Sequence, residues 1–127
     1  MPTTTNTITV SKCDNELVVL AYQWGASFEL CRILSGNSQP VSVTLNIQPG
    51  AYTGPIVLNG VNQPLSQTIT QNLANGQYSI LLLGIDWGGP AEFTVNVNGT
   101  SYTLPFQQEG QGLLFNQGPI ALTVPAS

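Results

Sequence analysis

The segment from Ile85 to Pro90, with the sequence Ile-Asp-Trp-Gly-Gly-Pro, combines residue types that recognise sugars. An indole ring stacks on the apolar C–H face of a pyranose, and a carboxylate accepts hydrogen bonds from paired hydroxyl groups. Two glycines let a ligand approach the backbone closely. We therefore expect four residues of this segment to bind a hydroxyl-rich ligand: Asp86, Trp87, Gly88 and Gly89. The alternative is that Trp87 covers the end of the core, while Asp86 accepts hydrogen bonds from the amides of its own turn.

Other aromatic and amide-rich positions are weaker candidates. A loop over residues 48–55 carries Tyr52, which we expect to add a second stacking surface to the ligand site. Its alternative role is local packing beneath its own loop. Residues 107–112 are rich in amides and glycine and indicate a solvated loop. Trp24 stands in an apolar run, so a core position is predicted for it.

Catalysis and metal binding find little support in the residue types. The chain has no histidine, which excludes Ser-His-Asp and Cys-His catalysis and zinc sites built on histidine. Glu92 and Asp86 are the one conceivable acid–base pair, and nothing in the sequence sets their separation. We therefore predict no enzyme activity and no cofactor. Calcium bound through Asp86 and loop carbonyls is a weak alternative, because no loop has clustered acidic ligands.

The cysteines and the cations have structural interpretations. Cys13 and Cys31 are compatible with one disulfide and equally with two free buried thiols, and the sequence leaves both open. Arg32 lies in an apolar stretch, where a charge needs a partner. We expect it to pair with Glu29 or Glu16.

Composition limits the partners. Charged residues make up 6% of the 127 residues, with two cations against six carboxylates and a net charge of −4. Two cations cannot form a groove for phosphates or a patch for anionic lipid, so neither nucleic acid nor a membrane is expected. Asn, Gln, Thr and Ser together supply 44 residues. Such neutral groups can contact a glycan, or a second copy of the chain, without desolvating ions. A glycan ligand and a homo-oligomer are therefore the expected partners.

Strands are the elements that must position these residues. Apolar and polar residues alternate over residues 91–97, which is the pattern of a half-buried strand. Asn98-Gly99 separates this run from a second alternating run, which predicts a hairpin over residues 91–106. Pro105 indicates a sheet edge or a strand end, because proline cannot donate to a ladder.

Glycine and proline divide the rest of the chain into short runs at intervals of roughly ten residues. Further strands are predicted at 7–10, 28–34, 41–47, 57–58, 68–70, 78–85 and 120–124. The pattern predicts an all-β fold, an antiparallel β-sandwich or jelly-roll of about 8–10 short strands, with a closed barrel as the alternative. Residues 15–24 fit a short helix or a strand, and their valines and aromatics favour a strand. One domain is expected over 1–127, with 1–5 and 125–127 loose.

These features together favour a binding protein. We expect a non-catalytic, lectin-like carbohydrate-binding protein that recognises hydroxyl-rich ligands through end loops. The alternative is a self-assembling structural, coat or toxin-like subunit that acts through protein–protein or membrane contacts. In composition alone the chain resembles microbial lectins and small secreted or inclusion-forming β-sandwich proteins, and it carries none of their calcium- or sugar-binding motifs. No signal peptide is visible after Met1, while the composition favours an extracellular or surface location.

Overall fold

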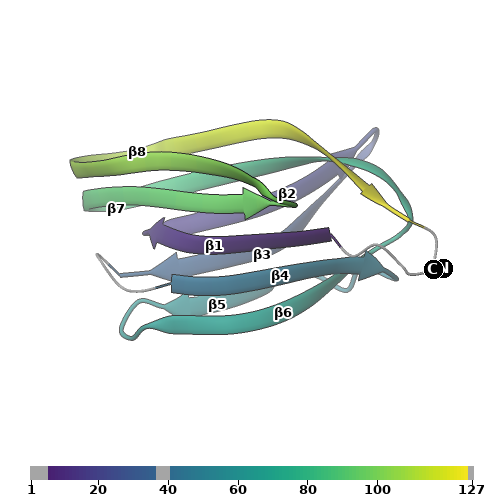
Figure 1. Cartoon of the computed structure of the whole chain (residues 1–127), viewed down its shortest axis with the longest axis horizontal. Helices are drawn as coiled ribbons and strands as arrows, with labels where there is room; N and C mark the ends of the chain where they lie inside the picture. The colour runs from purple at the N-terminus through teal and green to yellow at the C-terminus, as the bar shows by residue number, and fades with distance from the viewer. Residues whose placement is uncertain (1–5, 37–40, 126–127) are drawn as a thin grey trace.

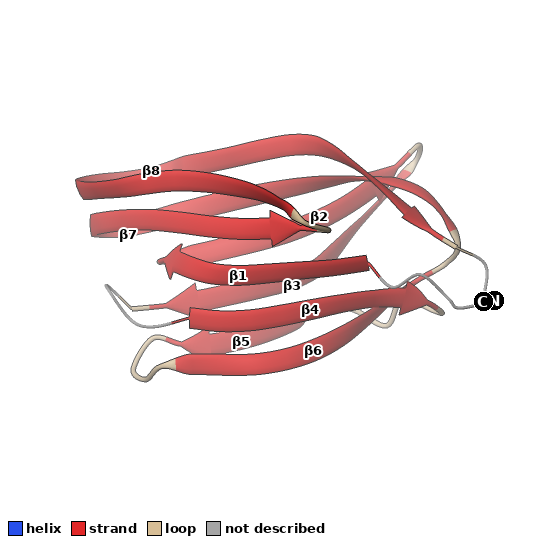
Figure 2. Cartoon of the chain, viewed as in Figure 1, coloured by secondary structure: helices blue, strands red, loops and turns tan. Residues whose placement is uncertain are grey.

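The computed structural model describes residues 6–36 and 41–125, and within these ranges every regular element is a strand (Figure 2). The predicted all-β fold is confirmed, and residues 16–23 form a strand. The strands are β1 (Asn6–Asp14), β2 (Glu16–Gln23), β3 (Ala26–Ser35), β4 (Val41–Pro49), β5 (Ile56–Gly60), β6 (Leu65–Leu73), β7 (Gly76–Val97) and β8 (Thr100–Val124). The segments expected to be loose, 1–5 and 125–127, lie outside the described ranges except for Pro125, which follows β8.

The strands form one sheet that folds back on itself into two halves (Figure 1). The first half contains β5, β3, β2, the N-terminal part of β7 and the C-terminal part of β8. The second half contains β6, β4, β1 and the remaining parts of β7 and β8, and it lies in front in Figure 1. The sheet wraps into a nearly closed, barrel-like shape, intermediate between the predicted sandwich and the alternative barrel.

The long strands correct the expectation of short ones. β7 has 22 residues and β8 has 25. β7 changes halves at residues 86–91, which we call the bend, where Gly88 and Gly89 have φ values of 120° and 93°. Glycine adopts such angles without steric cost, so the strand turns a corner and continues. Residues 107–112 cross the same corner inside β8 and are not the predicted loop.

The sequence predicted purely antiparallel pairing, and this expectation is also corrected. β3 pairs with β5 and β4 pairs with β6 in parallel. The chain crosses from the first half to the second after β3, and back again after β4. β5 therefore runs in the same direction as β3, and β6 runs in the same direction as β4.

The predicted hairpin is confirmed at Asn98 and Gly99, whose φ values are 50° and 96°. In the described part of the chain β8 pairs with β7 alone, so it is the edge strand that Pro105 indicated. Residues 78–85 are central, as predicted, because β2 and β8 flank them.

The core fills the space between the two halves. β7 buries Ile80 and Leu82 before the bend, and Phe93 and Val95 after it. The buried positions change from even to odd numbers because the bend interrupts the alternation of the strand. Across the core Phe93 stacks on Phe115, with ring centroids 5.3 Å apart and planes 9° from parallel. The ring pair thus joins residues of both halves.

Candidate functional site

Asp86 lies at the start of the bend with its side chain in the interior. The residue is 1% exposed, and neither carboxylate oxygen has a hydrogen-bond partner within the described residues. The backbone of β8 covers it, since a Cβ added to Gly110 would lie 3.0 Å from Oδ2. The expectation that Asp86 is open to a ligand beside Trp87 is therefore wrong. Asp86 faces the interior while Trp87 faces outward, because neighbouring residues of a strand point to opposite faces.

The buried carboxylate of Asp86 is expected to cost stability. Changing Asp86→Asn keeps the size of the side chain and removes its charge, so the free energy of unfolding should rise by about 1–3 kcal/mol. Urea denaturation at neutral pH measures the change. Glu109→Gln is the matched control, because Glu109 is exposed in β8 and should change stability by less than about 0.5 kcal/mol. A marked loss of stability in the Asp86 variant would show that the carboxylate is needed where it lies.

Trp87 lies on the outer surface of the first half and is 46% exposed. Its backbone N–H donates to Asn15 Oδ1 at 2.9 Å, and its indole Nε1 donates to Glu16 Oε1 at 3.2 Å. Asn15 also donates its backbone N–H to the carbonyl of Ile85 and its side-chain amide to the carbonyl of Ser35. The indole is thus held at the bend by contacts from β2 and from the residue between β1 and β2.

The charges beside Trp87 are satisfied within the chain. Arg32 donates to Glu29 Oε1 at 2.9 Å and also to Glu16 Oε2. The prediction that Arg32 pairs with a glutamate is confirmed, and it pairs with both. The hydrogen bond to Glu29 raises the pKa of Arg32 above its ordinary value, and partial burial acts in the opposite direction.

Tyr52 does not join Trp87 in one site. Its hydroxyl donates to the carbonyl of Glu29 at 2.8 Å, and its ring meets the edge of Phe28 at a centroid distance of 5.1 Å. Burial raises the pKa of its hydroxyl. Tyr52 thus lies beside Glu29, whereas Trp87 lies beside Glu16, whose partner in β3 is Leu34. Glu29 and Leu34 are five residues apart, which is a separation of about 16 Å along an extended strand. Tyr52 therefore has the local packing that was its alternative interpretation.

Both cysteines are free and buried, which resolves the alternatives that the sequence left open. Cys13 Sγ donates to the carbonyl of Ile33 at 3.7 Å. Burial raises the pKa of both thiols, that of Cys31 to about 12. A nucleophilic thiol needs a lowered pKa, so these positions are chemically inert.

The turn between β2 and β3 holds a surface that the sequence reasoning missed. Trp24 is fully exposed, at 102%, so its predicted core position is wrong. Gln23 pairs with Ala26, which leaves Trp24 and Gly25 as a two-residue turn, and Gly25 has a φ of 80°. The indole projects beyond the sheet because it stands at the tip of this hairpin. The Trp-Gly pair before Ala26 was the available signal, because glycine supplies the positive φ that tight hairpins need.

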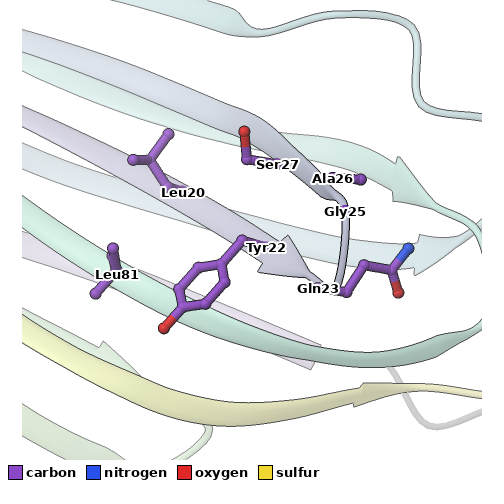
Figure 3. A pocket seen from close by; sticks show the side chains of 7 residues that line it. All are labelled: Leu20, Tyr22, Gln23, Gly25, Ala26, Ser27 and Leu81. Atoms are coloured by element: carbon purple, nitrogen blue, oxygen red, sulfur yellow. The ribbon is translucent and has the colours of Figure 1, made fainter.

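Two depressions flank Tyr22 beside this turn. The first, of about 540 Å³, is mainly apolar, and Figure 3 shows Tyr22 and Leu81 on adjacent strands among the residues that line it. The second, of about 500 Å³, contains more polar groups. It is lined by Tyr22, Gln23, Trp24, Gly25, Gln77, Tyr78, Ser79 and Ala121. We call this second depression the turn site.

Other classes of site find no support in residues 6–36 and 41–125. These residues contain no group of three or more His, Cys, Asp or Glu side chains that could hold a metal ion. They also contain no helix of the length and apolar character needed to cross a membrane. The fold and the site define an all-β protein with an aromatic, amide-lined depression at a hairpin tip. No family model, no curated protein and no solved structure matches the chain.

Proposed function

We propose that the protein is a non-catalytic carbohydrate-binding protein and that its ligand occupies the turn site. The observation that carries this proposal is a fully exposed indole, Trp24, beside a depression lined by neutral hydrogen-bonding side chains. This is an end-loop site, the kind that the sequence suggested, at a different position in the fold.

The chemistry of the lining suits a sugar. Trp24 and Tyr22 offer flat apolar rings for the C–H faces of a pyranose. The amides of Gln23 and Gln77 each donate and accept hydrogen bonds, as a sugar hydroxyl does. The residues that line the site carry no charge, so a neutral ligand can displace water without desolvating an ion.

The size and the chemical groups of the site favour binding over catalysis. A depression of about 500 Å³ falls in the usual range for small-ligand sites. Glycoside hydrolysis requires a pair of carboxyl groups, and the residues lining this depression include neither Asp nor Glu.

The test compares the two exposed tryptophans. Wild-type protein is screened on a glycan array, and the best glycan is titrated by calorimetry. Trp24→Ala removes a stacking surface worth on the order of 1.5 kcal/mol, so affinity should fall about tenfold or more. Gln77→Ala should also weaken binding, because it removes a donor and an acceptor from the lining.

Trp87→Ala is the matched control. It removes another exposed indole, in the bend of β7 and beside Glu16, at the end of β2 opposite to the turn site, so affinity should be unchanged. If Trp87→Ala abolishes binding and Trp24→Ala does not, the ligand lies at the bend and the turn site is wrong. If the wild-type protein binds no glycan on the array, the carbohydrate proposal fails.

A further inference from the structure

The chain contains three Asn-Gly pairs, at residues 59–60, 75–76 and 98–99. In such a pair the backbone nitrogen of the glycine can attack Cγ of the asparagine, because glycine has no Cβ to obstruct the approach. The new C–N bond closes a succinimide ring while the Cγ–Nδ2 bond breaks, and the leaving group takes up the proton of the glycine N–H and departs as ammonia. Water then opens the ring at one of its two carbonyls, which gives aspartate or isoaspartate. The fold decides which of the three pairs can reach this geometry.

The pair Asn98-Gly99 is held by hydrogen bonds, although Asn98 is exposed. Asn98 Oδ1 accepts from the backbone N–H of Thr7 at 2.8 Å, and Asn98 Nδ2 donates to Asn6 Oδ1 at 2.9 Å. The attacking nitrogen is also engaged, since the N–H of Gly99 donates to Asn96 Oδ1 at 2.8 Å. Ring closure must break these hydrogen bonds, so the hairpin protects its own asparagine.

The pair Asn59-Gly60 is held inside β5. Asn59 pairs with Leu34 in the parallel ladder, and its Oδ1 accepts from the backbone N–H of Val61 at 3.0 Å. Gly60 is buried, and a Cβ added to it would lie 2.8 Å from the Cβ of Leu65. The backbone around Gly60 therefore has little room to move, and ring closure requires this part of the sheet to open.

The pair Asn75-Gly76 lacks these restraints. Asn75 lies in the turn between β6 and β7, its side chain is exposed, and it has no hydrogen-bond partner among residues 6–36 and 41–125. The hydroxyl of Tyr78 donates to the carbonyl of Ala74 at 2.7 Å, which fixes the peptide before Asn75 and not the one after it. Gly76 is the first residue of β7 and pairs with Val124 at the end of the ladder, where local opening costs least.

We propose that Asn75 is a site of spontaneous deamidation, which the folded protein converts to isoaspartate and aspartate faster than it converts Asn59 or Asn98. The reaction replaces a neutral amide with a carboxylate, and so adds one negative charge to a chain whose net charge is −4. The new charge lies close to the turn site. Gln77 lines that site, and a Cβ added to Gly76 would lie 3.6 Å from Oε1 of Gln23, which also lines it. The deamidation itself requires no ligand, so it is independent of the proposed glycan binding.

The experiment follows the three asparagines in wild-type protein kept near neutral pH at physiological temperature, in buffer and in concentrated urea. Samples are digested at mildly acidic pH, where further deamidation is slow, and the peptides are mapped by chromatography and mass spectrometry. In the folded protein Asn75 should be converted about tenfold or more faster than Asn59 or Asn98, because only the other two require the structure to open. In urea the three positions should react at comparable rates, with isoaspartate among the products at each.

Asn75→Gln keeps a side-chain amide and requires a larger ring for the same attack, so the early acidic species on ion exchange should disappear. Asn59→Gln is the matched control, because it makes the same change in another Asn-Gly pair and should leave that species in place. Circular dichroism checks that both variants fold.

Three results would overturn the proposal. The first is conversion of Asn59 or Asn98 as fast as that of Asn75 in the folded protein. The second is a folded wild-type protein that keeps Asn75 intact while the sample in urea reacts. The third is an early acidic species that persists in Asn75→Gln.

Discussion

Replacing Phe93 with alanine should lower the free energy of unfolding by about 3–5 kcal/mol. Phe93 is completely buried, and its ring stacks on that of Phe115. Phe93 follows the bend in β7, whereas Phe115 lies in the part of β8 that belongs to the first half, so the pair holds the two halves together. The site cannot collapse easily, because the backbone of Gly84 already lies against the ring of Phe93 and the Cβ of Phe115. A Cβ added there would be 2.8 Å from Phe93 and 2.7 Å from Phe115.

Phe106→Ala is the matched control for this effect. Phe106 is 60% exposed in β8, so the same chemical change should alter stability by no more than about 0.5 kcal/mol. Equilibrium denaturation in urea gives both values, with the slope of the transition as a check on two-state unfolding. Equal, small losses in the two variants would show that the ring stack contributes little to stability.

The second large effect is the protection of the two thiols. Cys13 and Cys31 are almost wholly buried, so alkylation requires the surrounding structure to open. Their reaction with iodoacetamide in folded protein should be slower than in unfolded protein by a factor of about 10³ or more. Ser11→Cys adds a matched thiol at an exposed position of β1 and should label rapidly. Mass spectrometry counts the labelled positions, and fast labelling of Cys13 or Cys31 would contradict their burial.

The same burial makes stability depend on pH in the alkaline range. Burial raises the pKa of Cys31 to about 12, with Glu29 adding to the effect, and burial also raises the pKa of Cys13. In the unfolded chain thiols ionise near pH 8.5, so above this value the unfolded state loses protons that the folded state keeps. The stabilisation is complete below about pH 8.5 and falls with rising pH by about 1.4 kcal/mol per unit for each thiol.

Denaturation midpoints between about pH 8.5 and 10 test the slope, before tyrosine ionisation contributes. The double variant Cys13→Ala with Cys31→Ala should remove most of the decrease. A decrease of the same size in the double variant would assign the pH dependence to other groups.

The parts of the fold that could be predicted depend on neighbours along the chain. Alternation over 91–97 and the positive φ of Asn98-Gly99 are local properties, so the hairpin could be identified from the sequence. Arg32 could be given a glutamate partner because a cation in an apolar stretch needs one. The exclusions that follow from two cations and no histidine required no structure at all.

The expectation that Asp86 and Trp87 share one surface was wrong, because it depended on which face each residue takes. Asp86 and Trp87 are adjacent in sequence and point in opposite directions, because the glycines after them bend β7 without ending the strand. Trp24 was placed in the core because its neighbours are apolar, yet Gly25 places it at the tip of a hairpin.

Residue types and local patterns alone thus determined an all-strand chain with a neutral, hydrogen-bonding surface. Tertiary structure decided which aromatic rings face solvent, that the thiols are free and buried, and where β7 passes from one half of the sheet to the other. The physical reason is that a strand alternates its side chains between two faces, and that a single bend exchanges those faces. Whether each face meets the core or solvent depends on strands that are distant in sequence.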